Sequence, residues 1–320
     1  MKYIRLNTTD PYYNLALEEY LFKTAEDDVF MLWQNGPSVI AGKNQNVYAE
    51  VDLDYAKKEG INVCRRITGG GAVYHDLGNI NYTFISPRGV SSLNFEYFTR
   101  PIRSALLGLG IESTLGGRND IECRGSKISG NAQHVEGGRI LHHGTLLFDT
   151  DSSVMSRVLK VDKEKLAYRA VKSCSARVVN LCGLFEHKIS LDEFIYQIES
   201  RVCADLGAVR TAPPECEEIN ALYERNRSEE WIYSKRRYLT DYSVIRKKKF
   251  PFGLVIAELT LERELIKNIR ISGDFFSTRP IDELEAALVG TSPNMPPDID
   301  PSPFIDGMSR DELSLLLSGV

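Results

Sequence analysis

A run of three glycines after two arginines is the most unusual feature of this sequence. It reads Arg65-Arg66-Ile67-Thr68-Gly69-Gly70-Gly71-Ala72-Val73-Tyr74-His75-Asp76 and follows an apolar run typical of a strand. Consecutive glycines are costly unless the backbone needs unusual dihedral angles or touches something closely. Bare backbone amides and two arginines suit a carboxylate or a phosphate. A glycine-rich hairpin turn without a ligand is the alternative interpretation.

A lysine among small residues is the second candidate. The segment Gly116-Gly117-Arg118-Asn119-Asp120 is followed, after a tight turn at Arg124-Gly125-Ser126, by Lys127-Ile128-Ser129-Gly130. A cation held on a strand pins an anionic group better than a loop lysine does. A solvated lysine at the end of a hairpin is the alternative.

The histidines and cysteines give weaker indications. His142 and His143 are neighbours on an expected strand, so they point to opposite faces and cannot both ligate one metal. We expect one of them to lie near a pocket, where Gly144 permits close backbone approach. Cys123 is a possible nucleophile, with either histidine as its base, or else a small buried apolar residue.

Two common nucleotide-binding motifs are missing. The sequence contains no GxxxxGK[ST] loop, and no GxGxxG in a strand-to-helix context. Any nucleotide must therefore bind through another architecture.

The elements that must position these residues are mostly strands joined by hairpins. Capping residues and apolar spacing predict helices over residues 11–24, 52–59, 95–109, 191–206 and 217–227. Strands are expected over residues 29–33, 38–41, 61–64, 72–74, 80–85, 120–123, 127–132 and 139–148. Consecutive hairpins imply antiparallel pairing. We therefore predict an α+β fold with a mixed, mostly antiparallel sheet and flanking helices.

The end of the chain looks like a separate unit. We expect a turn over residues 246–253, a hairpin formed by 254–260 and 265–271, and helices over 280–289 and 309–317. The sequence therefore predicts two domains, residues 1–243 and 244–320, the second a small α+β domain. The basic residues 246–249 look like a solvated hairpin flank without a function.

Composition excludes several classes of protein. The chain has 320 residues, a formal charge of −5, 26% charged and 42% hydrophobic residues. This favours a globular protein and argues against a nucleic-acid binder. Six cysteines without CxxC spacing argue against a zinc site or a disulfide framework. Without a signal peptide or a long apolar run, we expect a cytoplasmic protein that does not enter a membrane.

One stretch departs from the acidic average. Residues 156–188 contain eight Lys or Arg against three Asp or Glu. This composition suits a mobile loop that closes over an anion, or a solvated basic face.

Taken together, these segments resemble the lipoate–protein ligase family. The glycine segment looks like the family's lipoate-binding loop, and Asn119-Asp120 followed by Lys127 looks like its catalytic-lysine motif. His142-His143-Gly144-Thr145-Leu146-Leu147 and the early Ser38-Val39-Ile40-Ala41-Gly42-Lys43-Asn44-Gln45-Asn46 are similar to two further blocks. Lys165-Leu166 and Ser175-Ala176-Arg177-Val178 look like a loop that folds over the adenylate. The blocks occur in order, and the end of the chain resembles the family's accessory domain.

This resemblance implies a fold and an activity. Members share the fold of biotin ligases and class II synthetase cores, and activate lipoate with ATP and Mg²⁺ to lipoyl-adenylate. They then transfer the lipoyl group to a lysine of lipoyl domains, as in 2-oxoacid dehydrogenase complexes and the glycine cleavage H protein. We expect no nucleic-acid or membrane partner, and a monomer.

The resemblance also assigns roles to residues. Lys127 would be the catalytic residue, between the lipoate carboxylate and the α-phosphate, and Asp120 would help to hold Mg²⁺. The amides near Ala72 and Val73 would read adenine, Arg66 would contact an anion, and Gly144 would line the lipoyl tunnel. The binding set implied by the resemblance comprises Arg66, Gly69, Gly70, Gly71, Ala72, Val73, Tyr74, Asn119, Asp120, Lys127, Ser129, Gly130, His143, Gly144, Thr145 and Arg177.

Three alternatives stay open at this point. Relatives on the same fold are octanoyl or lipoyl transferases that use a cysteine and no ATP, for which Cys123 and Cys174 are the candidates. A biotin ligase is a second alternative. A non-catalytic protein that binds lipoyl domains or a carboxylate ligand is the third.

Overall fold

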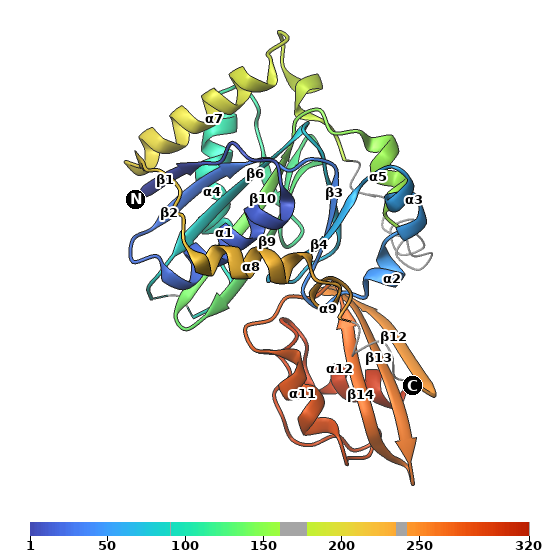
Figure 1. The fold of residues 1–320 in the computed structure, drawn as a ribbon. Coiled ribbons are helices and arrows are strands. Elements are labelled where there is room, and N and C mark those ends of the chain that lie inside the picture. Colours follow the sequence, from blue (N-terminus) through green and yellow to red (C-terminus); the bar gives the residue numbers. More distant parts are fainter. Residues whose placement is uncertain (90, 161–177, 235–241, 320) are drawn as a thin grey trace.

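An eight-stranded sheet runs through the larger part of the molecule, and a smaller unit at the end of the chain lies beside it (Figure 1). The structure is a computed structural model and describes residues 1–89, 91–160, 178–234 and 242–319. Among these residues, no helix combines the length and the apolar character that crossing a lipid bilayer requires.

The large sheet is mixed but mostly antiparallel. Its order is β11-β1-β2-β6-β10-β9-β8-β7, and only β1 pairs in parallel, with β2 and with β11. The strands are β1 (Lys2–Arg5), β2 (Val29–Trp33), β6 (Asn79–Ser86), β7 (Thr114–Gly116), β8 (Asp120–Cys123), β9 (Ser126–Glu136), β10 (Arg139–Leu147) and β11 (Val209–Arg210). The predicted fold class is confirmed, although β1, β7 and β11 were missed because they are short.

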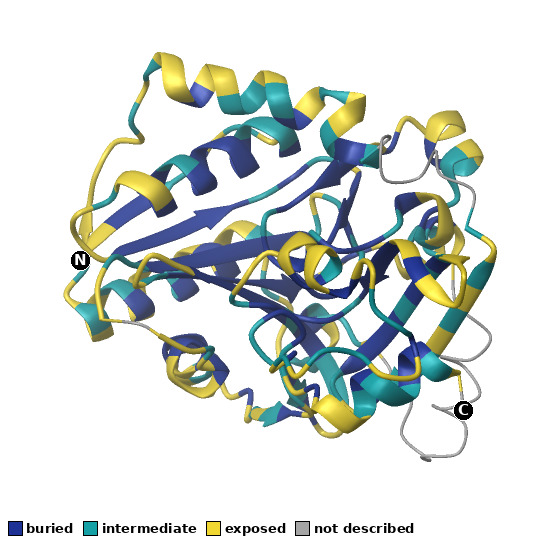
Figure 2. Cartoon of the chain, turned by 90° about the horizontal axis from the view of Figure 1, so that it is seen from below, coloured by how far each residue is buried: buried dark blue, intermediate teal, exposed yellow. Residues whose placement is uncertain are grey.

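Helices cover both faces of this sheet, whose central strands are buried (Figure 2). Helices α1 (Pro11–Thr24) and α8 (Glu217–Arg227) lie on one face, and α4 (Phe95–Leu107) and α7 (Leu191–Leu206) on the other. Strand β2 is buried on both sides, because Phe30 and Leu32 pack under α4 and α7 while Val29, Met31 and Trp33 pack under α1. Helix α1 begins as predicted, with Asp10 accepting hydrogen bonds from the Tyr12 and Tyr13 amides.

A second sheet of three strands carries the glycine segment. Strand β3 (Ser38–Ala41) lies between the parallel β4 (Asn62–Arg65) and the antiparallel β5 (Val73–His75). Short helices pack around it: α2 (Val47–Glu50), α3 (Leu53–Lys58), α5 (Ser152–Val158) and α9 (Glu229–Tyr233). The glycines therefore connect β4 to β5 at one end of this sheet.

Two tight hairpins place the lysine segment. Arg124 and Gly125 have φ values of 51° and 74°, and Gly137 and Gly138 have 60° and 77°. Positive φ at both central residues defines the type I′ turns that suit the twist of paired strands. Lys127 therefore lies in β9 as the sequence predicts, although the strand begins one residue earlier, at Ser126.

The C-terminal unit contains the sheet β12-β13-β14 and two helices. Its elements are β12 (Val244–Phe250), β13 (Gly253–Glu262), β14 (Leu265–Gly273), α11 (Ile281–Leu288) and α12 (Arg310–Ser318). They form a separate core that includes Val255, Leu284 and Leu316. The predicted turn over 246–253 is wrong for residues 246–249, which lie in β12. Residues 246–249 are four consecutive basic residues without apolar alternation, so their sequence did not reveal the pairing with β13.

The unit contacts the larger body beside the glycine segment. The Gly70 amide donates to the Phe275 carbonyl at 3.2 Å, and the Gly273 amide donates to the Asn44 carbonyl at 3.0 Å. Arg118 pairs with Asp306 and lies 4.5 Å from the centre of the Phe276 ring. The glycine segment thus lies between the larger body and the C-terminal unit.

Candidate active site

A cavity of about 290 Å³ lies where the glycine loop (residues 66–71) meets β9 and β10. Most of the residues singled out in the sequence line it, although they come from four separate segments. They are Arg66, Gly70, Gly71, Ala72, Val73, Asn119, Lys127, Gly130, His143, Gly144 and Thr145.

Four of the remaining candidates lie beside the cavity instead of in its wall. Gly69 packs against the C-terminal unit, and Tyr74 lies in the core of the small sheet. Ser129 is fully buried in β9, and Asp120 contacts the Lys127 side chain. Arg177, Lys165 and Cys174 lie outside the described residues. The same is true of most of the basic stretch 156–188.

The glycine loop is braced from inside by Arg66. This guanidinium is buried and donates to Thr68 Oγ1 (2.8 Å) and to the carbonyls of Ile40 (2.9 Å), Gly69 (2.6 Å) and Gly71 (2.8 Å). Burial lowers the pKa of Arg66 to about 10. The side chain thus stays charged near neutral pH and fixes the loop that lines the cavity.

The glycines themselves are required by close packing. A Cβ atom on Gly69 would lie 2.4 Å from the Phe275 carbonyl oxygen, and one on Gly42 would lie 2.0 Å from the Gly70 carbonyl oxygen. Gly70 also has a φ of 86°. A side chain at Gly69 or Gly42 would therefore clash with neighbouring backbone. This close packing favours a loop fixed by its surroundings over a simple hairpin turn.

The side chain of Lys127 lies close to the backbone of Gly130. Its Nζ is 2.7 Å from Asp120 Oδ1, and a Cβ on Gly130 would lie 2.9 Å from the same Nζ. The side chain is 27% exposed. The amine is therefore partly shielded from water and remains accessible from the cavity, where a carboxylate or a phosphate would interact with it.

Asn119 is fixed to β9 next to this amine. Its Nδ2 donates to the Asn131 carbonyl at 2.5 Å, and Asn131 Nδ2 donates to the Asn119 carbonyl at 2.9 Å. Asn131 Oδ1 in turn accepts a hydrogen bond from the Tyr82 hydroxyl. A Cβ on Gly144 would lie 2.2 Å from Asn131 Oδ1, so a glycine is needed at that point of β10.

The two adjacent histidines face opposite sides of β10, as predicted. His143 lies in the cavity wall, with Nδ1 3.0 Å from both oxygens of Glu18 and Nε2 2.9 Å from Thr68 Oγ1. His142 packs on the other face, with its ring stacked on Phe98. The chain Glu18–His143–Thr68–Arg66 links two buried charges through hydrogen bonds.

Sequence reasoning missed part of the wall. Leu15, Trp33, Ile40, Asn81 and Asn131 also line the cavity, and Glu18 lies behind His143. A polar residue at an alternating position of a strand otherwise built from Ile80, Tyr82 and Phe84 could have indicated Asn81. Leu15, Trp33 and Ile40 look like ordinary core residues in the sequence, and no local pattern marks the polar Asn131 and Glu18 as part of a site.

Two buried N–H groups in the wall have no hydrogen-bond partner among the described residues, His75 Nε2 and Asn81 Nδ2. Asn14 Nδ2 donates to Asn35 Oδ1, so Asn35 Nδ2 donates to His75 Nδ1 and the proton of neutral His75 is assigned to Nε2. Buried donors are normally paired. A ligand with acceptor atoms would supply the missing partners.

Burial makes the histidines acid-sensitive. It lowers the pKa of His75 to about 3, with help from the Arg66 charge, and holds the pKa of His142 well below its usual value. As the pH falls, the unfolded chain therefore binds protons that the folded chain does not. The contribution of these histidines to the free energy of unfolding is complete above about pH 6.5 and is lost as the pH falls below it.

We expect His75 to cost about 2 kcal/mol of unfolding free energy between pH 7.5 and pH 5, and His142 to add a loss of the same sign. Urea unfolding at both pH values measures the loss. In His142→Phe the loss should be smaller than in wild type. An equal loss in wild type and variant would show that His142 does not contribute.

The cysteine alternative finds little support in this geometry. Cys123 is buried in the main core, and neither histidine forms a hydrogen bond with it in the described part of the chain. In the same ranges, no group of three or more His, Cys, Asp or Glu side chains is placed to hold a metal ion.

Comparison with known proteins gives one consistent result. Residues 10–202 match the family described as lipoyl protein ligase A/B catalytic domain, and residues 240–295 match the bacterial lipoate protein ligase C-terminus. The lipoate–protein ligase LplJ of Bacillus subtilis is 39% identical over 293 residues, covering 89% of this chain and 88% of that protein.

Solved structures agree with the sequence relatives. The structure of LipL1 from P. falciparum in complex with lipoate has a TM-score of 0.80 at 24% identity and covers 99% of this chain and 98% of the other. A lipoate–protein ligase A bound with ATP has a TM-score of 0.59 at 27% identity, covering 72% and 98%. A bipartite lipoate protein ligase from Thermoplasma acidophilum, described with its E2 lipoyl domain, has a TM-score of 0.61 at 29% identity, covering 76% and 98%.

Proposed function

The chain belongs to the lipoate–protein ligase family, and from this premise we propose that it uses ATP to activate lipoate and transfers the lipoyl group to a lysine of a lipoyl domain. One observation carries the proposal most directly. A single cavity joins the amine of Lys127 to the apolar side chains of Leu15, Trp33 and Ile40. Such a wall suits an acyl chain with an anionic head group.

The reaction has two steps. In the first, a carboxylate oxygen of lipoate attacks the α-phosphorus of ATP, and pyrophosphate leaves. In the second, the amine of the acceptor lysine attacks the acyl carbonyl carbon, AMP leaves, and the amine loses a proton. In both steps negative charge shifts between the carboxyl group and the α-phosphate.

Lys127 is the proposed catalytic residue in both steps. Its amine would lie between the carboxylate and the α-phosphate, where it stabilises the developing charge. Asp120 holds the amine at 2.7 Å and Gly130 leaves room for it. A preorganised cation of this kind needs little rearrangement during the reaction.

The glycine loop is the proposed binding element for the adenylate. Ala72 and Val73 follow the loop in the cavity wall, where their amides would read the adenine, as the family resemblance implies. Arg66 keeps its proposed role as an anion contact, but the structure also makes it the brace of the loop.

Mg²⁺ fits this site as an ion held mostly by its substrate. Mg²⁺ usually keeps several waters and binds one or two carboxylates together with phosphate oxygens. Asp120 supplies one such carboxylate beside Lys127 and Asn119. We propose that Asp120 contacts the ion, which would neutralise phosphate charge when bound.

We assign the two parts of the chain to two domains with different roles. We propose that residues 1–243 form the catalytic domain and residues 244–320 the accessory domain. The acceptor class that we propose comprises the lipoyl domains of 2-oxoacid dehydrogenase complexes and the glycine cleavage H protein, modified by a monomeric enzyme.

Pyrophosphate release tests the activation step without any acceptor. The proposal predicts release only when ATP and lipoate are both present, and no release with biotin. An acyl transferase that uses a cysteine would release none, and a protein that only binds its ligand would be stabilised by lipoate without turnover. Either result would overturn the proposed reaction.

The unpartnered donors in the wall predict a preference among acyl substrates. Lipoate carries two sulfur atoms, which accept weak hydrogen bonds, whereas octanoate has no acceptor along its chain. In Asn81→Leu we expect the ratio of kcat/KM for lipoate over octanoate to fall by roughly threefold to tenfold. Asn268→Leu, on the exposed face of β14, is the control. An unchanged ratio would contradict a role of Asn81 in selecting the substrate.

A further inference from the structure

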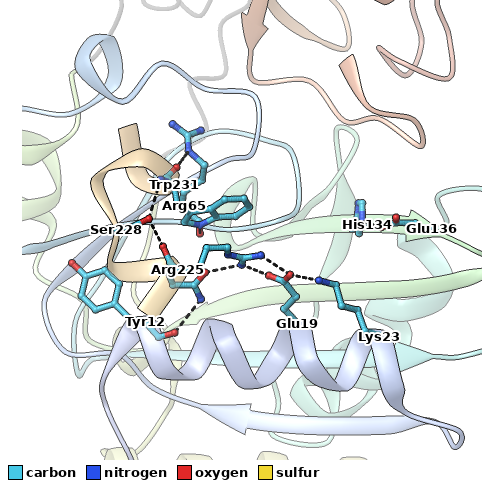
Figure 3. Close-up of polar contacts among 10 residues, drawn as sticks. Tyr12, Glu19, Lys23, Arg65, His134, Glu136, Arg225, Ser228 and Trp231 are labelled. Atoms are coloured by element: carbon cyan, nitrogen blue, oxygen red, sulfur yellow. Dashed lines mark hydrogen bonds and ion pairs between the residues drawn. The ribbon is translucent and has the colours of Figure 1, made fainter. Parts of the chain in front are cut away.

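A buried network joins the segment before the C-terminal unit to the glycine loop. Helices α8 and α9 cross the molecule near the junction between the two parts, and residue 242 is the next described residue after Ser234 (Figure 1). Figure 3 shows the polar contacts that fasten these helices to α1 and to the end of β4. None of the side chains of Arg65, Arg225 and Trp231 lines the cavity.

Three hydrogen bonds join Arg65 to α9, two of them with Trp231 and one with Ile232. The indole Nε1 of Trp231 donates to the Arg65 carbonyl at 2.9 Å. In return, Arg65 Nε donates to the carbonyls of Trp231 and Ile232, each at 3.0 Å. Ile232 is buried in the core of the small sheet, which keeps α9 in place.

The other end of the Arg65 side chain reaches a loop that supports the cavity. Its Nη1 donates to the carbonyls of Gly42 (2.8 Å), Lys43 (3.0 Å) and Gln45 (2.9 Å). The Lys43 amide donates to the Thr68 carbonyl at 2.8 Å. A displacement of Arg65 would therefore be transmitted both to the 42–45 loop and to the glycine loop.

Arg225 packs against the indole ring of Trp231. Its guanidinium carbon lies 3.9 Å from the centre of the Trp231 ring, and the group forms a two-point contact with Glu19 (Figure 3). Lys23 Nζ lies 2.6 Å from the same carboxylate. Burial raises the pKa of Glu19, but Arg225 and Lys23 outweigh it, so the net pKa is lowered and Glu19 is charged near neutral pH.

We propose that Arg225 and Trp231 are positioning residues of the active site. Acting through Arg65, they hold the 42–45 loop and the glycine loop in the geometry that binds substrate. The segment leading to the C-terminal unit is thereby coupled to the pocket. The inference rests on the proposed function, because it assigns these residues an effect on substrate binding.

The test compares Trp231→Phe and Arg225→Gln with wild type. Trp231→Phe keeps an aromatic ring for Arg225 but loses the donor to Arg65. Arg227→Gln is a matched control, because Arg227 is on the same helix as Arg225. Its side chain lies over the Tyr223 ring and forms an exposed ion pair with Glu224. Arg225→Lys keeps the charge opposite Glu19 and serves as the conservative variant.

Steady-state pyrophosphate release should show a specific pattern. We expect the KM values for ATP and lipoate to rise by roughly threefold to tenfold in Trp231→Phe and Arg225→Gln, with kcat within about twofold of wild type. Arg225→Lys should recover part of the increase, and Arg227→Gln should resemble wild type. KM values unchanged in both variants would overturn the proposal.

Hydrogen exchange separates this proposal from the proposed function, because it needs no turnover. In both variants, amides of residues 42–45 and 66–71 should exchange faster, while those of β9 and β10 should not. Unchanged exchange in the two loops, or equal acceleration throughout the chain, would overturn the coupling. Absence of pyrophosphate release by wild type would instead contradict the proposed function and leave the exchange result to decide the coupling.

Discussion

Lys127→Ala should lower the rate of lipoyl-adenylate formation by at least a hundredfold, equivalent to roughly 3 kcal/mol of transition-state stabilisation. The reason is that the amine faces the cavity, partly shielded from water, where the carboxylate and the α-phosphate exchange charge. Single-turnover formation of lipoyl-adenylate, followed by quenching and chromatography, measures this step.

The control for this variant is Lys58→Ala, which removes a lysine with a 79% exposed side chain in α3. Both variants should unfold at urea concentrations close to that of wild type, because the Lys127–Asp120 pair is partly exposed and contributes little to stability. Adenylate formation by Lys127→Ala at the wild-type rate would remove Lys127 from the mechanism.

Arg66→Lys is expected to have the second largest effect. The guanidinium donates four hydrogen bonds at separate points, and three of them end on backbone carbonyls around the cavity. An ammonium group is a single point of charge and cannot reach all four acceptors. We expect the KM values for ATP and lipoate to rise at least tenfold, and the unfolding free energy to fall by about 2–4 kcal/mol.

Isothermal titration with lipoate and urea unfolding separate the two parts of this prediction. Arg88→Lys, at an exposed position, is the matched control. Unchanged affinity in Arg66→Lys would show that the brace is dispensable for binding, even if stability decreases.

The sequence was a good guide to the local elements near the site. Positive φ values at Gly125, Gly137 and Gly138 follow from glycine, which favours tight hairpins, whereas Arg124 has a positive φ that its residue type does not favour. The bounds of β8 and α7 agree with the expected ranges, because alternating apolar residues and capping residues mark them. The short strands β1 and β11 depend on pairing with distant segments and leave little local signal.

The site was predicted as a set of motifs and not as an arrangement. Glu18 and His143 are 125 positions apart, and only the folded chain brings them together beside Thr68. Similarly, the sequence suggested Arg66 as an anion contact but did not reveal that its guanidinium also donates to carbonyls of its own loop and of β3. Contacts of this kind depend on tertiary packing, which a single sequence does not encode in its local pattern.

The role of the C-terminal unit beside the loop was also invisible in the sequence. Phe275 and Phe276 look like core residues of that unit, yet the Phe275 carbonyl accepts from the Gly70 amide and Phe276 packs on Phe95 of α4. The need for glycine at position 69 therefore comes partly from a neighbouring unit.

Intact-mass spectrometry of an apo lipoyl domain tests the central claim most directly. The domain is incubated with the protein, lipoate and Mg²⁺, with and without ATP. The account predicts that the mass increases by one lipoyl group only when ATP is present, and that replacing the acceptor lysine of the domain abolishes the increase. An increase without ATP, or no increase with ATP, would contradict it.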